Sequence, residues 1–304
     1  MEVYINKPFL KWVGGKTQII NHIIKKFPKH MNNYYEPFLG GGSVLLALLS
    51  YKKAGHIEIN GKVFVNDINE NLIALYRNIQ KEPQAVIKEV NKIYLEFEAS
   101  SGTHINRNPQ SIDEAKTSRE AYYYWIRKQF NILTKEERIK PIGSAMMLFL
   151  NKTCFRGLYR EGPNGFNVPY GNYKKPTILE VGDIMRISEL IQEVEFICDS
   201  YKTFLSNVAT EDFVYLDPPY APESSTSFVN YTASGFTMED HTSVLNLCKD
   251  IVNKNAKMLL SNADVSFVKE AFDDKYNIDI ISCRRAIHSK EPASRTNEVL
   301  IYNH

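Results

Sequence analysis

The sequence predicts an α/β fold in which a mostly helical module interrupts a sheet covered by helices on both faces. Short apolar runs alternate with helical segments at both ends of the chain, a pattern typical of such sheets. The middle, from residue 81 to about 150, has helical spacing without this alternation, and residues 151–176 are rich in Gly, Asn and Pro. We therefore expect residues 1–80 and 190–304 to form one domain and residues 81–189 to form an inserted module.

The first half of the predicted sheet has two strands, each followed by a helix. Residues 33–38 form a strand that ends in a glycine turn, and the apolar helix 43–51 follows. Residues 62–65 form a second short strand, and residues 69–80 carry apolar side chains at helical spacing. These elements are the start of an alternating α/β arrangement.

The second half of the predicted sheet comes late in the chain. Four short β-like runs occupy residues 195–198, 213–216, 257–260 and 278–282, and residues 298–302 add a final edge strand. Helices at 241–253 and 265–272 lie between the last of these runs, and Thr237 with Asp240 forms a capping box for the first helix. The polar stretch 99–116 of the module is expected to be a loop.

Composition excludes several classes of protein. Hydrophobic residues make up 43% and charged residues 24% of the 304 residues, which is ordinary for a globular protein. No apolar run approaches the roughly 18 residues of a membrane span, and the N-terminus lacks a signal-peptide pattern. The four cysteines are far apart without a CxxC pair, so we expect reduced thiols in a cytoplasmic protein and no metal site. The net charge of +2 gives no evidence about nucleic acid, so such evidence has to be local.

The most informative motif is Asp217-Pro218-Pro219-Tyr220, directly after the apolar run 213–216. Ligands of open α/β sheets bind at the carboxyl ends of strands. A carboxylate and the Pro218 carbonyl accept the two hydrogens of an exocyclic amine, and the Tyr220 ring stacks on a planar base. Proline fixes the backbone and removes competing N–H donors. A simple tight turn after a strand is the alternative interpretation.

A second motif, EPFLGGGS at residues 36–43, precedes the apolar helix. Glycines allow close approach of a ligand to the backbone, and a helix N-terminus offers free N–H groups to a carboxylate. Asp67 lies 25 positions after Gly42, where an acid in nucleotide-binding folds contacts ribose hydroxyls. The pair indicates a nucleoside-containing cofactor, although a helix cap and a surface turn would leave the same pattern.

Two further segments bear on ligands. KWVGGKT at residues 11–17 ends like a P-loop, but Leu10 stands where that motif requires glycine, so nucleotide hydrolysis is excluded. Residues 151–176 carry five Lys or Arg against one acid, a local charge of +4, with interleaved aromatic residues. Lysines contact phosphates and arginine recognises guanine, so this segment is expected to bind nucleic acid, against the alternative of a solvated basic loop.

Together these segments resemble the Dam-type, or D12 class, DNA adenine-N6 methyltransferases. The shared motifs follow the family's order over nearly the whole chain: KWVGGK, YYEPFLGGGS, VFVNDIN, FRGLYR with GFNVPYG, DPPY, and the pair Phe228 and Tyr231. The resemblance implies a Rossmann-like S-adenosylmethionine-dependent methyltransferase sheet with an inserted, mostly helical DNA-recognition module. It further implies transfer of a methyl group from S-adenosylmethionine to an adenine flipped out of double-stranded DNA.

The resemblance also implies a role for each matching residue. Asp217, Pro218, Pro219 and Tyr220 correspond to the catalytic motif. The residues implied for the cofactor are Trp12, Lys16, Glu36, Phe38, Gly40, Gly42, Asp67, Asp199 and Asp217. Those implied for DNA are Phe155, Arg156, Tyr159, Arg160, Asn167, Pro169 and Lys174. Among them Lys16 lies near the methionine carboxylate, Asp67 holds the ribose, and Arg160 recognises the first guanine of GATC.

One residue departs from the family's pattern. The GATC enzymes of the family have Asn-Gly-Leu where this chain has Arg156-Gly157-Leu158, so the target is GATC or a related short palindrome. Two other kinds of function remain open on the sequence. The enzyme could methylate another planar amine, namely cytosine N4, adenine in RNA or a protein glutamine, or the chain could be a catalytically silent DNA-binding module. The oligomeric state and the biological context, such as a restriction-modification system, do not follow from the sequence.

Overall fold

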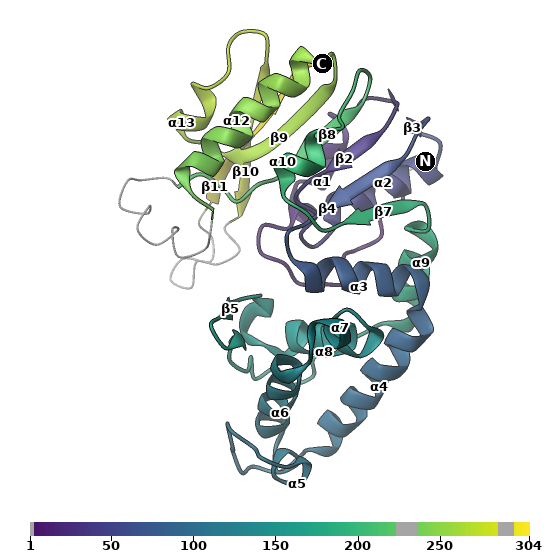
Figure 1. The fold of residues 1–304 in the computed structure, drawn as a ribbon, viewed down its shortest axis with the longest axis vertical. Coiled ribbons are helices and arrows are strands. Elements are labelled where there is room, and N and C mark those ends of the chain that lie inside the picture. The colour runs from purple at the N-terminus through teal and green to yellow at the C-terminus, as the bar shows by residue number, and fades with distance from the viewer. Residues whose placement is uncertain (1–2, 223–235, 285–294) are drawn as a thin grey trace.

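The computed structural model describes residues 3–222, 236–284 and 295–304. Within these residues, a sheet of seven strands forms the centre of the fold (Figure 1). Its strands, in spatial order, are β10 (Asn277–Arg284), β11 (Arg295–Tyr302), β9 (Lys257–Ala263), β8 (Phe213–Leu216), β2 (Tyr34–Glu36), β4 (Val63–Asn66) and β7 (Val194–Ile197). Strands β9, β8, β2, β4 and β7 run parallel, so their carboxyl ends meet at one edge. The predicted Rossmann-like α/β sheet is confirmed.

The final strand was expected at the edge, and this was wrong. Strand β11 lies between β9 and β10 and runs antiparallel to both, which leaves β10 at the edge. The physical reason is burial, since Val299, Leu300 and Ile301 are each fully buried and such a run needs cover on both faces and both sides. Ile280 of β10 is 56% exposed, as suits an edge strand.

Helices cover both faces of the sheet, as predicted. One face carries α1 (Ile20–Ile24), α2 (Ser43–Lys53) and α3 (Glu70–Lys81), and the other carries α10 (Tyr201–Leu205), α12 (Met238–Asn253) and α13 (Ser266–Lys269). The capping box is present, since Thr237 and Asp240 make both of its hydrogen bonds at the start of α12. Helix α13 is shorter than the predicted 265–272, because Val265 is extended and the chain leaves the helix after Lys269.

The inserted module lies beside the sheet and is mostly helical (Figure 1). Its elements are α4 (Pro83–Ala99), α5 (Ile112–Ala115), α6 (Arg119–Ile132), α7 (Lys135–Arg138), α8 (Pro141–Thr153), η2 (Phe155–Gly157), and the hairpin β5 (Glu161–Gly162) and β6 (Gly165–Phe166). The predicted loop 99–116 contains only the single turn α5, which Ser111 caps. Helix α9 (Val181–Leu190) then packs against α2 and α3 and returns the chain to β7.

The module and the sheet share one apolar core. Phe97, Tyr122 and Phe149 of the module belong to the same buried cluster as Leu45 and Leu46 of α2. Shorter elements complete the fold: η1 (Lys16–Gln18) precedes α1, and β1 (His30–Met31) pairs with β3 (Glu58–Ile59). Among the described helices, none has the length and apolar character to cross a membrane. The shared core fixes the position of the module relative to the carboxyl edge of the sheet.

Candidate active site

Lys16, Asp217 and Tyr220 meet at the carboxyl edge of the sheet. The Lys16 Nζ lies 2.8 Å from Asp217 Oδ2 and 4.8 Å from the centre of the Tyr220 ring. It also donates a hydrogen bond of 2.6 Å to the Gly14 carbonyl. The Lys16 side chain is 3% exposed and that of Asp217 is 18% exposed. One ammonium group therefore covers both the carboxylate and the ring predicted to be catalytic.

The glycine turn positions Lys16. The Lys16 N–H donates to Ser43 Oγ at 3.0 Å, which joins the N-terminal turn to the first residue of α2. Gly42 is left-handed with φ 69°, and the Tyr76 hydroxyl donates to the Gly41 carbonyl at 2.9 Å. The turn after β2 is therefore hydrogen-bonded to Tyr76 of α3 and, through Ser43, to the N-terminal segment. It lies at the carboxyl edge of the sheet.

The predicted cofactor residues lie on three neighbouring strand ends. Asp67, just after β4, accepts hydrogen bonds from the backbone N–H groups of Gly40 and Asn69, each at 3.0 Å. Asn66 joins the strand ends further, because its amide donates to the carbonyls of Pro37 and Asp199. The Asp199 N–H donates back to Asn66 Oδ1 at 2.9 Å. This network brings the glycine turn, Asp67 and the exposed Asp199 into one row.

Burial raises the pKa of three acids at this edge of the sheet, namely Glu36, Asp67 and Asp217. Glu36 is 2% exposed, and burial, together with the charges of Asp217 and Asp67, raises its pKa to about 8, against the hydrogen bond from Tyr34. Burial also raises the pKa of Asp217 to about 6, although the Lys16 ammonium opposes that shift. At pH 7 the protonated form of Glu36 therefore predominates, whereas Asp217 is mostly a carboxylate.

The raised pKa of Glu36 predicts a pH-dependent stability. The folded state holds a proton on Glu36 that the unfolded state loses above pH 4.5, so the free energy of unfolding falls as pH rises from 4.5 to 8. The slope is at most about 1.4 kcal/mol per pH unit. Glu36→Gln keeps an acceptor for Tyr34 and removes this dependence. Urea unfolding at pH 5 to 8 should show the variant gaining on the wild type with rising pH; a constant difference would contradict the assignment.

The residues predicted to bind DNA surround the turn η2 and the hairpin that follows it. Phe155 is 45% exposed at the start of the turn, and the Arg156 guanidinium lies 5.2 Å from the centre of its ring. The Phe155 N–H donates to the Pro169 carbonyl at 2.8 Å. Arg160 Nε donates to Asn167 Oδ1 at 2.6 Å, with both residues exposed. The structure thus brings five of the seven predicted residues together on one surface, and Lys174 is exposed further along the chain.

Trp12 and Tyr159 join this surface to the glycine turn. Their rings stack at 5.6 Å with an angle of 26°, and the Trp12 ring lies against Gly40 and Gly41. The Tyr159 hydroxyl donates to Glu161 and accepts from Asn71 of α3. Both aromatic residues were predicted to contact ligands, and the structure gives them contacts with each other and with the turn.

Several residues of the site belong to no recognisable sequence motif. Ser261 of β9 and Glu298 of β11 contact the Tyr220 hydroxyl, at 3.2 Å and 2.6 Å. Asn66 and Tyr76 hold the strand ends and the glycine turn, as described above. Asn66 directly precedes Asp67, and its position at the end of an apolar strand is the feature of the sequence that points to a role in the site. Phe228 and Tyr231 lie outside the described residues.

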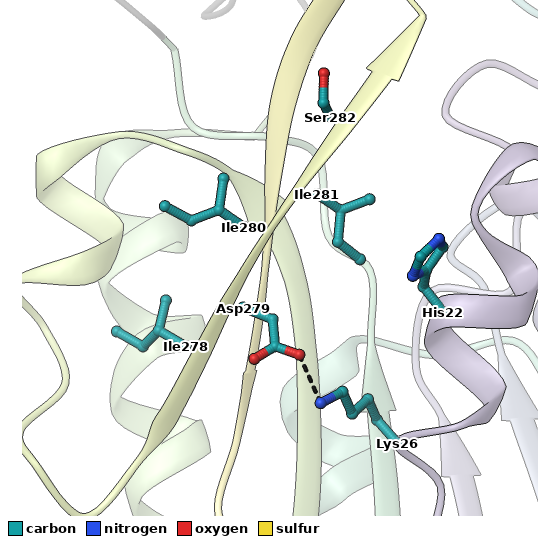
Figure 2. A pocket seen from close by; sticks show the side chains of 7 residues that line it. All are labelled: His22, Lys26, Ile278, Asp279, Ile280, Ile281 and Ser282. Carbon is teal, nitrogen blue, oxygen red and sulfur yellow. Dashed lines mark ion pairs between the residues drawn. The ribbon is translucent and has the colours of Figure 1, made fainter.

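A groove of about 650 Å³ lies elsewhere, between α1 and the edge strand β10 (Figure 2). It is lined by His22, Lys26 and residues 278–282, and Lys26 pairs with Asp279 across it at 2.5 Å. No residue predicted for cofactor or DNA lines this groove. A search of the described residues found no cluster of three or more His, Cys, Asp or Glu suited to a metal ion.

A mostly parallel sheet with a glycine turn and an Asp-Pro-Pro-Tyr segment at its carboxyl edge is the arrangement expected of a methyltransferase that acts on an amino group. Residues 12–287 match the model of the D12 class N6 adenine-specific DNA methyltransferases, and the chain belongs to this family. It is 35% identical to the type II methyltransferase M.MjaIII of Methanocaldococcus jannaschii, over 98% of this chain and 99% of that protein. It is 31% identical to the DNA adenine methylase of Vibrio cholerae (95% and 92% covered) and 29% identical to that of Escherichia coli K12 (93% and 90%). The chain is an adenine-specific DNA methyltransferase.

Proposed function

We propose that this enzyme transfers a methyl group from S-adenosylmethionine to N6 of an adenine flipped out of double-stranded DNA, within GATC or a related short palindrome. The observation that carries the proposal is the meeting of Asp217, Lys16 and Tyr220 beside the glycine turn. We assign catalysis and cofactor binding to residues 1–80 and 190–304 and DNA recognition to residues 81–189. We further propose that the enzyme is cytoplasmic and associated with DNA.

The residues of the edge suit S-adenosylmethionine. Gly40 and Gly42 adopt the left-handed conformations that shape this turn, and the Lys16 ammonium suits a carboxylate. We assign Asp67 to the ribose hydroxyls and Asp199 to the cofactor adenine, with Glu36 and Phe38 beside the methionine part and Trp12 supporting the turn. When bound, the cofactor supplies an electrophilic methyl group; the remaining steps belong to the chain's own residues.

Asp217 and the Pro218 carbonyl orient the target amine. Each accepts one N6 hydrogen, so the nitrogen lone pair is directed away from them and toward the methyl group. The Asp217 carboxylate stabilises the positive charge that N6 gains during attack. The Lys16 ammonium pairs with the Asp217 carboxylate and lies over the face of the Tyr220 ring. It therefore has to move before a base can bind there. A carboxylate on the cofactor offers Lys16 an alternative partner.

Arg156 bears on which DNA sequence the enzyme recognises. It lies in the left-handed region with φ 57°, a conformation that asparagine adopts more readily than arginine. The Tyr173 hydroxyl accepts the Arg156 N–H at 3.0 Å, and Asn151 donates to the Gly157 carbonyl, so the turn is held from two sides. An arginine kept in this backbone conformation beside the exposed Phe155 suits direct contact with DNA, which favours a target related to GATC with a different flank.

Arg160 and Lys174 are expected to differ in their effect on specificity. Arg160→Ala should cost about 1–3 kcal/mol of discrimination at one base pair, because arginine makes two hydrogen bonds to guanine. Lys174→Ala is the matched control and should weaken binding to all DNA about equally. Competition binding with duplexes altered at one position each measures both. A sequence-independent loss in Arg160→Ala would make Arg160 a phosphate contact.

Mapping of methylated bases tests the proposed function as a whole. Plasmid DNA treated with pure enzyme and S-adenosylmethionine is read by single-molecule sequencing. N6-methyladenine within GATC or another short palindrome supports the proposal and identifies the target. Methylation of cytosine, or of RNA and not DNA under the same conditions, would overturn it.

A further inference from the structure

We propose that Glu298 is a positioning residue that fixes the ring of Tyr220 in the orientation needed to stack on the target base. The inference rests on the proposed function, since the stacking role of Tyr220 belongs to it. The Tyr220 hydroxyl donates to Glu298 Oε2 at 2.6 Å, a short hydrogen bond to a carboxylate. Glu298 belongs to β11, the strand that enters the sheet between β9 and β10.

The Tyr220 side chain is held at both ends. At its backbone end, Pro218 and Pro219 restrict the chain, and the next N–H, that of Ala221, donates to Asn262 Oδ1 at 3.1 Å. At its hydroxyl end, Glu298 accepts the hydrogen bond and Ser261 Oγ lies 3.2 Å away. Asn262 and Ser261 are on β9, and Glu298 is on the neighbouring β11. Two strands therefore determine the position of the ring.

The fixed ring presents a face to the catalytic carboxylate. Lys16 Nζ lies 4.8 Å from the ring centre and 2.8 Å from Asp217 Oδ2, so ring face and carboxylate border the same small space. A base that enters this space has to stack on the ring while its amine reaches Asp217. A small rotation of the ring would displace the amine, and displacement by about 1 Å costs up to roughly 10²-fold in rate.

The chemistry of the pair favours Glu298 as the acceptor. Burial and the charges of Asp217 and Glu298 raise the pKa of Tyr220 well above its ordinary value, so its hydroxyl keeps the proton. Among the hydrogen bonds and ion pairs of the described residues, Glu298 has none with Asp217 or Lys16. Its charge does raise the pKa of Asp217, so Glu298→Gln, which removes the charge and keeps the acceptor, separates that effect from the effect on Tyr220. Without Glu298 the phenol would keep only the longer contact to Ser261 Oγ at 3.2 Å, and other rotations of the ring would become accessible.

A double-mutant cycle tests the role. We expect Glu298→Ala to lower the single-turnover methylation rate about tenfold at saturating cofactor and DNA, with unchanged DNA binding. Glu298→Gln keeps an oxygen acceptor and should restore the rate to within about threefold of the wild type. In a Tyr220→Phe background, which keeps the ring and removes the hydroxyl, Glu298→Ala should cause no further loss. An equal loss in both backgrounds, or a wild-type rate in Glu298→Ala, would overturn the proposal.

A spectroscopic measurement separates this proposal from the proposed function. With 3-fluorotyrosine incorporated at position 220, the ¹⁹F resonance is recorded without cofactor or DNA. Glu298→Ala should shift the resonance and Glu298→Gln should shift it less, because the ring loses or keeps its partner. An unchanged resonance in Glu298→Ala refutes the positioning role whether or not the enzyme methylates DNA. If Glu298→Ala shifts the resonance but the wild-type enzyme does not methylate DNA, only the proposed function is refuted.

Discussion

Asp217→Ala is expected to abolish methyl transfer while DNA binding stays measurable. In the proposed mechanism the carboxylate is the acceptor that orients N6 and stabilises its developing positive charge, and removing one such group costs roughly 10²–10³-fold in rate. Its removal also leaves Lys16 with no ion-pair partner among the described residues at the edge of the sheet. Because Asp217 belongs to the turn after β8 and not to the surface proposed to bind DNA, binding should survive.

Single-turnover methylation of a short duplex and gel-shift binding measure the two effects separately. Asp250→Ala, an exposed acid on α12, is the control for removal of a negative charge. The pKa of Asp217 near 6 adds a second check on the wild type, because the carboxylate form prevails above that pH. The rate at subsaturating DNA should therefore be half-maximal near pH 6 and reach its plateau about one unit or more above it. Wild-type turnover in Asp217→Ala would exclude the mechanism.

Strand positions were predictable because buried parallel strands leave apolar runs in the sequence. Strand β8 has the predicted bounds, and all four of its residues are buried. The order of the strands was not predictable in the same way. The insertion of β11 between β9 and β10 pairs Glu298 with Ala263 past the whole of β10, and periodicity does not encode such a pairing.

The candidate site shows the same division. Motif residues such as Lys16, Asp67 and Asp217 carry their chemistry in their residue type and in their position after strands or in turns. Glu298 carries no such mark, because its role follows from the pairing of β11 with β9. Trp12 was assigned to the cofactor by resemblance, and its stacking on Tyr159 of the module emerges only from the tertiary fold.

In the proposed mechanism, Lys16 faces both the cofactor and the target amine. Its ammonium has Asp217 as ion-pair partner and also lies over Tyr220, so a cation lies where the neutral target amine is proposed to bind. The pairing also keeps the buried Asp217 ionised, since the Lys16 charge lowers the pKa that burial raises. In the proposed mechanism a substrate amine replaces Lys16 at Asp217, and the cofactor carboxylate becomes the partner of Lys16.

Gly42→Ala is expected to disable cofactor binding and to destabilise the fold. Gly42 has φ 69°, where an alanine costs about 1 kcal/mol. A Cβ added there would lie 2.3 Å from the Tyr76 hydroxyl oxygen, so Tyr76 would have to move and would lose its hydrogen bond to the Gly41 carbonyl. Overpacking of this kind costs a further 1–3 kcal/mol or so. The displaced turn would carry Gly40 away from Asp67.

Gly55→Ala is the matched control, because Gly55 has φ 74° and open space around its Cα. It should lose only the cost of the left-handed backbone, about 1 kcal/mol, and keep cofactor affinity. Calorimetric titration with S-adenosylmethionine and urea unfolding compare the two variants. Gly42→Ala should lose affinity at least about tenfold, since a shift of the turn removes several contacts at once. Tyr76→Phe in the Gly42→Ala background removes the clashing oxygen and should recover part of the stability. Equal behaviour of the two alanine variants would mean that the turn tolerates a side chain and that Gly42 serves only the backbone conformation.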